Sequence, residues 1–124
     1  MQAKDIMTTN VVTIKPEAKI EEGMRLLLSN NISGLIVVND NLEAVGVVTE
    51  KDFLVAYDFL GSKDALVKEF YSKDVISISE DDLVEDVSRL LVKKNIKRVP
   101  VIKEKKVVGI VSRIDIIEHI LKEK

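Results

Sequence analysis

A hydroxyl residue followed three positions later by aspartate occurs twice in this chain, each time after a glycine and a short apolar run. The phrase VGVVTEKD places Thr49 and Asp52 at this spacing, and VGIVSRID places Ser112 and Asp115 there. A hydroxyl at a helix start lies beside free backbone N–H groups, which attract an anion such as phosphate. A carboxylate one turn further on can accept two hydrogen bonds from a vicinal diol. The spacing therefore suits the phosphate and ribose of a nucleotide.

Each residue of the phrase also has an ordinary structural explanation. The hydroxyls can cap a helix, and the aspartates can complete a capping box or interact with the helix dipole. Gly46 and Gly109 can let another backbone approach closely. For a single copy, the structural explanation is the stronger one, so a functional interpretation depends on what surrounds the two copies.

The two phrases belong to a repeat that covers nearly the whole chain. Residues 3–41 align with 67–105, and after one deletion residues 45–54 align with 108–117, which gives 14 identities in 49 pairs. This similarity indicates an internal duplication, and it predicts two repeats, residues 1–62 and residues 63–124.

Each repeat predicts the order strand, helix, strand, strand, helix. Residues 10–14 and 74–78 have the β-branched composition of strands. The next segment in each repeat has the apolar spacing of a helix, with acidic residues in its first turn. Two further apolar runs, separated by polar turns at 39–41 and 104–106, predict a β-hairpin. The last helix begins at the hydroxyl residue of the repeated phrase.

Length and composition favour one α/β domain of the α+β-like kind. A chain of 124 residues with 46% apolar residues can bury a core, whereas a repeat of about 60 residues is marginal alone. We therefore expect the two β-α-β-β-α repeats to pack sheet to sheet as one compact domain with pseudo-two-fold symmetry and two equivalent clefts.

The chemistry-bearing residues exclude several classes of protein. The chain has no cysteine and one histidine, His119, which argues against disulfides, a cysteine nucleophile and the usual zinc sites. His119 is expected at the surface or at an interface. The acidic run 80–86 lacks the ligand spacing of a calcium loop. No phosphate-binding or hydrolase motif is present, so we expect no metal site and no enzyme activity.

The distribution of charge and hydropathy bears on location and partners. No apolar run approaches the ~18 residues of a membrane span, and the N-terminus lacks the apolar stretch of a signal peptide, so a cytoplasmic protein without a membrane partner is expected. The net charge of −2 makes nucleic-acid binding unlikely. A lysine-rich stretch keeps that alternative open, although a solvated face is the favoured explanation over an anion site; its members are Lys93, Lys94, Lys97, Arg98, Lys103, Lys105 and Lys106.

The complete pattern resembles a tandem pair of CBS domains, the module first described in cystathionine β-synthase and also called a Bateman module. The resemblance covers DIMTTNVVTIKPEAKIEEGMRLLLSNNISGLIVVND with VGVVTEKD, then VISISEDDLVEDVSRLLVKKNIKRVPVIKEKKVVGIVSRID. It implies regulatory binding of AMP, ADP or ATP, sometimes of S-adenosylmethionine or a dinucleotide, in the clefts between the two halves. No cofactor is implied. Ribose and base contacts are common to all these ligands, so the choice among them stays open here.

The resemblance also implies which residues bind the nucleotide. The two aspartates would hold ribose hydroxyls, the hydroxyl residues would contact ribose or phosphate, residues of the first strands would border the base, and the basic pair before the second strand of repeat two would reach phosphates. The set is Thr13, Ile14, Gly34, Leu35, Thr49, Asp52, Ser77, Ile78, Lys97, Arg98, Val99, Pro100, Ser112 and Asp115.

The first repeat departs from this pattern where the phosphate contacts should be. It has Ser33 and Gly34 at the positions of Lys97 and Arg98. We therefore expect two unequal sites, with phosphate charge met chiefly from the second repeat. Arg98 is expected to face solvent and to be able to serve either cleft.

Together these observations predict a non-catalytic module that binds an adenine nucleotide and acts as an energy or metabolite sensor. The alternatives are a ligand-independent oligomerisation scaffold and a nucleic-acid-associated protein. With no effector domain recognisable in the chain, the regulated partner is expected to be another polypeptide. Surplus apolar residues in DFLVAYDFL and IDIIEHIL also predict a homodimer.

Overall fold

The predicted order of strands and helices is largely present in the computed structural model, which describes residues 1–123. The elements of the first repeat are α1 (Ala3–Ile6), β1 (Thr13–Ile14), α2 (Ile20–Asn30), β2 (Gly34–Val38), β3 (Ala44–Thr49) and α3 (Glu50–Leu60). Those of the second are the 3-10 helix η1 (Val67–Glu69), α4 (Val84–Lys93), β4 (Arg98–Lys103), β5 (Lys106–Ser112) and α5 (Arg113–Lys122). The mixed α/β fold class predicted from the repeat is confirmed.

The chain forms two compact units, and their boundaries differ from those of the sequence repeats. The first-repeat unit consists of residues 12–75, and the second-repeat unit consists of residues 1–11 together with residues 76–123. The division into repeats 1–62 and 63–124 concerns the duplicated sequence and stays a prediction. The compact units differ from it because each lead-in segment, the stretch before the first strand, packs on the other repeat.

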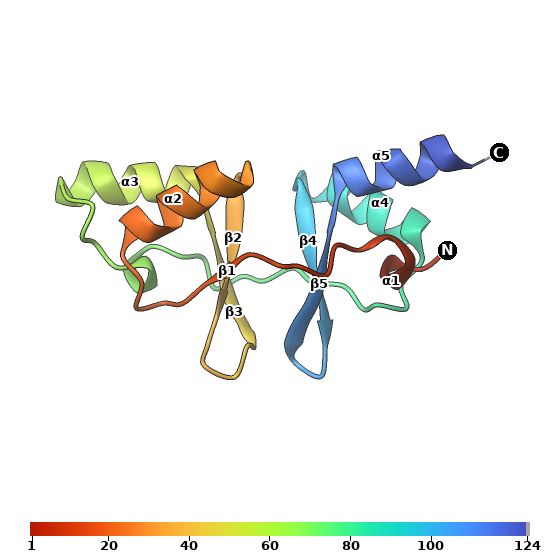
Figure 1. Ribbon diagram of the computed structural model, residues 1–124, viewed down its shortest axis with the longest axis horizontal. Helices are drawn as coiled ribbons and strands as arrows, with labels where there is room; N and C mark the ends of the chain where they lie inside the picture. The colour runs from red at the N-terminus through yellow and green to blue at the C-terminus, as the bar shows by residue number, and fades with distance from the viewer. Residues whose placement is uncertain (124) are drawn as a thin grey trace. The chain divides into compact units, whose positions relative to one another are not determined.

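The first-repeat unit is built on a three-stranded sheet in the order β1-β2-β3. β1 is parallel to β2, with Ile14 opposite Val37, and β2 is antiparallel to β3, with Val37 opposite Gly46. In Figure 1, α2 and α3 lie next to each other at one side of this sheet. Their contact is close at Gly23, where an added Cβ would collide with the Phe53 ring.

The second-repeat unit has the antiparallel hairpin β4-β5, to which residue 78 adds a single parallel bridge opposite Val101. Glu104 and Lys105 at the tip both have positive φ, as a tight two-residue hairpin turn requires. The predicted hairpins are thus confirmed in both repeats. The predicted first strands are mostly wrong, since only Thr13–Ile14 forms a strand and residues 74–78 form none. Most residues of each segment belong to the connection between the two units, and they have no neighbouring strand with which to form β-sheet hydrogen bonds.

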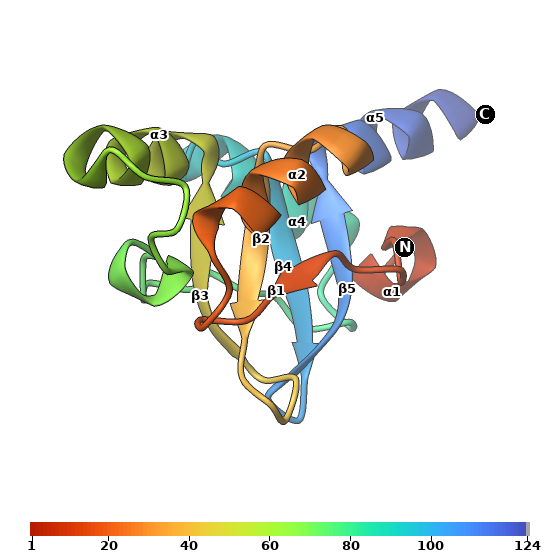
Figure 2. The ribbon, with the colours of Figure 1, turned by 60° about the vertical axis from the view of Figure 1, so that its left-hand side comes forward.

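The two lead-in segments are held by matching hydrogen bonds. In the second-repeat unit, the Ala3 N–H donates to the Asp82 carbonyl at 2.8 Å, and Thr8 and Ile110 exchange two backbone bonds. In the first-repeat unit, Val67 N–H donates to the Ala18 carbonyl at 2.9 Å, and residues 72 and 47 exchange two backbone bonds. Figure 2 shows α1 beside β5 and η1 on the side of β3. Each repeat's lead-in therefore completes the sheet edge of the other repeat.

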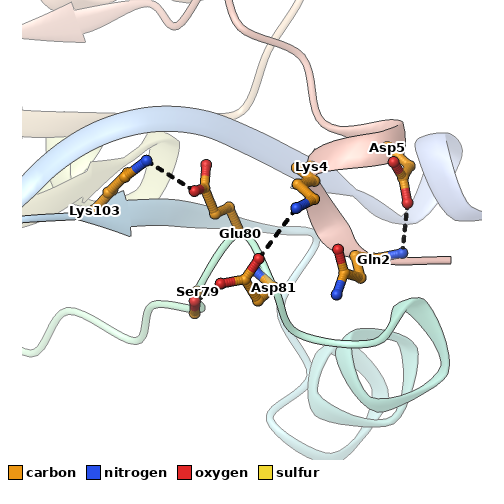
Figure 3. Close-up of polar contacts among 7 residues, drawn as sticks. All are labelled: Gln2, Lys4, Asp5, Ser79, Glu80, Asp81 and Lys103. Atoms are coloured by element: carbon orange, nitrogen blue, oxygen red, sulfur yellow. Dashed lines mark hydrogen bonds and ion pairs between the residues drawn. The ribbon is translucent and has the colours of Figure 1, made fainter.

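Polar contacts add to the attachment of α1. Figure 3 shows Lys4 Nζ beside Asp81 Oδ1 at 3.3 Å, and the Gln2 N–H donating to Asp5 Oδ2 at 2.8 Å. Lys103 Nζ at the end of β4 lies 3.1 Å from Glu80 Oε1, and this contact raises the pKa of Lys103. The Lys4–Asp81 pair is exposed, so it orients the lead-in more than it stabilises it.

Each unit has its own hydrophobic core, and each core includes a lead-in residue. Val67 is fully buried with Leu35, Val37 and Val48 in the first-repeat unit; Ala3 is fully buried among the core residues of the second. The helix contact is filled differently in the two copies. Gly23 and Phe53 in the first correspond to Val87 and Ile116 in the second, so a small and a large side chain are replaced by two of intermediate size.

The glycine of the repeated phrase is required by the lead-in segment. A Cβ at Gly46 would overlap the Tyr71 ring and lie 2.5 Å from the Ser72 carbonyl oxygen. A Cβ at Gly109 would lie 2.5 Å from Met7 Sδ. At Gly46 a backbone atom of the opposite repeat's lead-in does approach closely, as predicted, whereas at Gly109 the close neighbour is the Met7 side chain of the other lead-in.

The two glycines should respond differently to substitution by alanine. In Gly46→Ala the clash includes a backbone oxygen, so the lead-in must move, and we expect a loss of about 1–3 kcal/mol in the free energy of unfolding. In Gly109→Ala the clash is with a flexible methionine, so at most about 1 kcal/mol should be lost. Equilibrium unfolding in urea measures both; equal losses would contradict this account of the contacts.

Candidate functional site

The repeated phrase folds into the same backbone frame in both units. The first cradle is formed by Ser33, Gly34 and residues 49–52, where the start of β2 meets the start of α3. Gly34 lies opposite Thr49, and the first helical N–H, at residue 50, donates to the Ser33 carbonyl at 3.0 Å. The antiparallel pairing thus brings the strand start to the helix start.

The second cradle repeats this geometry with residues 97, 98 and 112–115, where β4 begins beside the start of α5. Arg98 lies opposite Ser112, and the Arg113 N–H donates to the Lys97 carbonyl at 3.0 Å. Because backbone atoms make these contacts, the frame does not depend on which side chains occupy positions 33, 34, 97 and 98.

Both hydroxyl–aspartate pairs form the predicted capping boxes. Asp52 Oδ2 accepts the backbone N–H of Thr49 at 2.8 Å, and Asp115 Oδ2 accepts that of Ser112 at 2.8 Å. In the second cradle Ser112 Oγ also accepts the Asp115 N–H at 3.1 Å. In the first cradle the Thr49 hydroxyl donates to Asp52 Oδ2 at 3.1 Å. The structural explanation of these residues is therefore correct.

Capping leaves part of each carboxylate available. Only Oδ2 of each aspartate takes part in the cap, and Oδ1 makes no hydrogen bond within residues 1–123. The helix start offers fewer free N–H groups than the sequence suggests, because the N–H of residue 50 or 113 is bonded to the carbonyl of the residue just before β2 or β4. Each cradle thus presents an acceptor oxygen in a fixed position and only a reduced set of backbone donors.

Arg98 is partly buried in the second-repeat unit, so the expectation of a solvent-facing side chain is wrong. Its Nε is enclosed and has no hydrogen-bond partner within residues 1–123. Burial lowers the pKa of Arg98, and the nearby Asp115 carboxylate opposes this shift. A guanidinium nitrogen left without a partner is uncommon in folded proteins.

Arg113 is a cradle residue that the sequence reasoning did not identify. Its Nε donates to the Ile96 carbonyl at 2.9 Å, and its Nη2 donates to the Leu91 carbonyl and to Asn95 Oδ1, both at 3.4 Å. Arg113 therefore binds carbonyls at the C-terminal end of α4 and just beyond it, as a cation near a helix C-terminus is expected to do. No local signal in the sequence indicates this contact, because it joins residues about 20 positions apart.

The other predicted site residues lie at the first-strand positions and at the starts of the hairpin strands β2 and β4. Thr13 and Ile14 lie in β1, and Ser77 and Ile78 precede the α4 turn. Five of these residues are buried. Ile14 and Leu35 belong to the core of the first-repeat unit, and Ile78 and Val99 to that of the second-repeat unit. Pro100, beside Val99 in β4, is also buried. The structure thus gathers the predicted residues in two groups, one in each unit, and leaves chiefly the polar members with accessible side chains.

The lysine-rich stretch does not form one patch. Lys93, Lys94 and Lys97 lie before β4, whereas Lys105 and Lys106 lie at the hairpin turn beyond its other end. A strand separates the two groups. This division weakens the explanation of the stretch as a continuous nucleic-acid-binding surface.

His119 is more enclosed than the sequence suggests. Its side chain is 12% exposed, and its Nε2 lies 3.0 Å from Glu123 Oε1. His119, Asp115 and Asp5 border a hollow of about 400 Å³ between α1 and α5. Within residues 1–123, no three histidine or acidic side chains gather as a metal site requires. No helix in this range is long and apolar enough to cross a membrane.

The family model for the CBS domain matches this chain twice, over residues 3–58 and 67–122. The chain therefore belongs to the CBS domain family. The uncharacterized protein MJ1225 of Methanocaldococcus jannaschii is 30% identical over 115 residues, which cover 93% of this chain and 41% of MJ1225. The chain thus spans less than half the length of this relative.

Solved CBS structures share the fold over nearly the full chain. The CBS domain pair of protein MJ0100, in complex with 5′-methylthioadenosine and S-adenosyl-L-methionine, is 30% identical with a TM-score of 0.85; the match covers 100% of this chain and 98% of that one. CBSX2 of Arabidopsis thaliana, in complex with AMP, is 26% identical with a TM-score of 0.87 and coverage of 98% and 96%. The resemblance inferred from the sequence is confirmed.

The two caps should differ in their contribution to stability. Ser112→Ala removes an acceptor for the Asp115 N–H, and we expect it to lower the free energy of unfolding by about 1 kcal/mol. Thr49→Ala removes a hydroxyl that donates to an exposed carboxylate, so its loss should be nearer ~0.5 kcal/mol. Urea unfolding of the two variants makes the comparison, and a larger loss for Thr49→Ala would be the contrary result.

Proposed function

We propose that this protein is a non-catalytic regulatory module that binds adenosine-containing ligands at its two cradles. The observation that carries the proposal is that the two carboxylate oxygens of each aspartate are used differently. One oxygen of Asp52 and of Asp115 holds the helix cap, and the other has no partner within residues 1–123. A carboxylate whose position is fixed in this way is suited to accept hydrogen bonds from the two hydroxyls of a ribose.

Arg98 supports the phosphate part of the proposal. Its guanidinium lies near Asp115 and has an enclosed Nε without a partner. We propose that a phosphate oxygen accepts a charge-assisted hydrogen bond from the accessible part of this half-buried guanidinium. Lys97, which is exposed next to it, adds positive charge. The first-strand residues Thr13, Ile14, Ser77 and Ile78 are proposed to border the base, and the backbones of Gly34, Leu35, Val99 and Pro100 to lie beside it.

The ligands of the similar structures support the same class of ligand. The MJ0100 domain pair is in complex with 5′-methylthioadenosine and S-adenosylmethionine, and CBSX2 is in complex with AMP. These ligands share adenosine and differ at the 5′ position. The contacts available to Asp52 and Asp115 involve the shared ribose, which fits a module able to bind AMP, ADP, ATP or related adenosine compounds.

The regulatory role is proposed to act through a separate effector. The repeated fold brings no candidate nucleophile or acid–base pair to the cradles beyond the capping groups. The effector is proposed to be another polypeptide whose state changes when the cradles fill, so that the module reports energy or metabolite status in the cytoplasm.

The ribose contact is tested by removing one hydroxyl from the ligand. If Asp115 Oδ1 accepts hydrogen bonds from both ribose hydroxyls, 2′-deoxy-AMP loses a charge-assisted bond worth roughly 1.5–3 kcal/mol. Its dissociation constant should be about tenfold to a hundredfold higher than that of AMP. Titration calorimetry of the two ligands on the full chain measures this ratio.

The variant Asp115→Asn provides the matched control for this test. Asparagine keeps an oxygen for the cap but lacks the charge, so the preference for AMP over the deoxy ligand should shrink in the variant. Equal affinity for AMP and 2′-deoxy-AMP in the unmodified chain would mean that Asp115 only caps the helix and does not bind the ribose. Absence of binding by any adenosine ligand would instead favour a ligand-independent scaffold.

A homodimer remains part of the proposal because both terminal helices expose apolar side chains. Phe59 on α3 and Leu121 on α5 are each 79% exposed. We expect light scattering at tens of micromolar to give twice the monomer mass. Phe59→Glu or Leu121→Glu should favour the monomer, whereas Leu42→Glu, at an exposed site in the β2–β3 connection, should not. A monomer in the unmodified chain would refute this part.

A further inference from the structure

The helix α3 has an inner face that belongs to the core and an outer face that points away from it. On the inner face, Phe53 and Ala56 are buried in the core of the first-repeat unit. On the opposite side, four exposed residues follow the i, i+3, i+4 and i+7 spacing, which places them in one row along the helix. We call this row the outer stripe; its members are Lys51, Leu54, Val55 and Asp58.

The middle of the outer stripe is apolar and accessible to solvent. Leu54 is 68% exposed and Val55 is 53% exposed. Phe59 lies one turn after Val55, at the margin of the stripe, and is exposed as well. Three neighbouring apolar side chains on the outside of one helix form a patch of the kind that marks a surface for association.

The two ends of the outer stripe have opposite charges. Lys51 precedes the apolar middle and Asp58 follows it. Neither side chain forms an ion pair within residues 1–123. Seven positions separate them by about 10 Å along the helix axis, whereas ion pairs within a helix join residues three or four apart. Each charge is therefore available to a partner outside the chain.

Both charges also lie at the unfavourable end of their own helix. Because α3 extends from Glu50 to Leu60, Lys51 is in the first turn and Asp58 is in the last. The helix dipole favours an acid in the first turn and a base in the last. A partner that brings an acid to Lys51 and a base to Asp58 would offset both unfavourable placements.

We infer that α3 packs against α3 of a second copy of this chain, antiparallel and with the outer stripes face to face. With a two-fold axis between positions 54 and 55, Leu54 lies opposite the partner's Val55. The same axis places Lys51 opposite the partner's Asp58. Such an interface is isologous, so each of these contacts occurs twice. The inference rests on the homodimer of the proposed function, and it names the surface and the register of that homodimer.

The antiparallel arrangement also corrects the placement of the charges relative to the helix dipoles. Asp58 comes to lie beside the first turn of the partner's α3, and Lys51 beside its last turn. A parallel pair of α3 helices would instead bring like charges together at both ends of the stripe, which disfavours association. The charge pattern therefore selects the antiparallel pair.

The corresponding face of α5 does not complement the outer stripe. If α3 met α5 of a second copy in the same register, Lys51 would face the partner's Leu121. Asp58 would then face the partner's Ile114. Both charges would lose water without gaining a partner, which is costly. The residues of α5 at these positions are Ile114, Ile117, Glu118 and Leu121.

The test is reversal of the two charges, with the dissociation constant of the dimer measured by sedimentation equilibrium of the full chain. Lys51→Glu places acids opposite each other at both contacts, and Asp58→Lys places bases there. Each single variant should raise the dissociation constant by roughly tenfold to a hundredfold. The double variant, Lys51→Glu with Asp58→Lys, restores opposite charges at both contacts and should return the constant to near that of the unmodified chain.

Mixing the two single variants shows whether the charges act between copies. A Lys51→Glu chain and an Asp58→Lys chain have opposite charges at both facing positions. The mixed dimer should therefore form about tenfold more tightly than a dimer of either variant alone. Fluorescence transfer between differently labelled chains measures this preference.

Two matched controls make the same charge changes outside α3. Lys73→Glu and Asp74→Lys lie at exposed positions of the connection after η1. Each should change the dissociation constant of the dimer by less than about twofold, since a distant exposed charge is screened by salt.

Thermal unfolding separates a lost contact from a damaged fold. Both single replacements give α3 a charge that agrees with its dipole. At concentrations where every chain is a monomer, Lys51→Glu and Asp58→Lys should therefore unfold at the same temperature as the unmodified chain or at a higher one. Weaker association by chains of undiminished stability then reports the interface itself.

The outcomes distinguish the pairing of α3 from the proposals on which it rests. If both single variants dimerise as tightly as the unmodified chain, or if the double variant is weaker than either, the α3 pairing is wrong and the homodimer forms through another surface. A monomeric unmodified chain would overturn the homodimer and this inference together. Titration with AMP tests the adenosine sites separately in every case.

Discussion

The interaction on which the site depends is the hydrogen bond from the backbone N–H of each cap residue to the aspartate three positions later. Its length is 2.8 Å in both repeats. It fixes the aspartate side chain and begins the last helix of each repeat, whose start lies beside the beginning of the first hairpin strand. A carboxylate bound in this way has one oxygen committed to structure and one available to a ligand. The capping role of Asp52 and Asp115 and their proposed binding role are therefore compatible, because they use different atoms.

A second constraint lies in the exchanged lead-in segments. Neither repeat completes its own sheet edge or core, because Ala3 is buried in the second-repeat unit and Val67 in the first. A repeat of about 60 residues buries too small a share of its surface to be stable by itself. The exchange means that each unit contains sequence from both copies. Gly46 and Gly109 make room for the exchanged segments, since a side chain at either position would collide with the lead-in.

The features that could be predicted from the sequence are those determined over short distances along the chain. Capping boxes depend on residues three apart, hairpins on a turn between two apolar runs, and helices on apolar spacing, and all three were predicted correctly. The lead-in exchange was missed, because no pattern within a repeat shows which partner its first residues have. For the same reason the partial burial of Arg98 and the contact of Arg113 with the end of α4 were not foreseen. Both depend on elements that only the tertiary fold brings together.

The divergence of the two cradles follows from how their frame is made. Ser33, Lys97, Glu50 and Arg113 contribute backbone carbonyl and N–H groups to the frame, so their side chains can change without disturbing it. A duplicated site of this kind can alter its charge while keeping its geometry. Arg98 is the informative case, because an enclosed Nε without a partner has an energetic cost in the free protein. Nothing in the frame requires an arginine there, as Gly34 demonstrates at the corresponding position of the first repeat. The frame therefore does not impose this cost, and the phosphate contact proposed for the accessible part of the guanidinium would offset it.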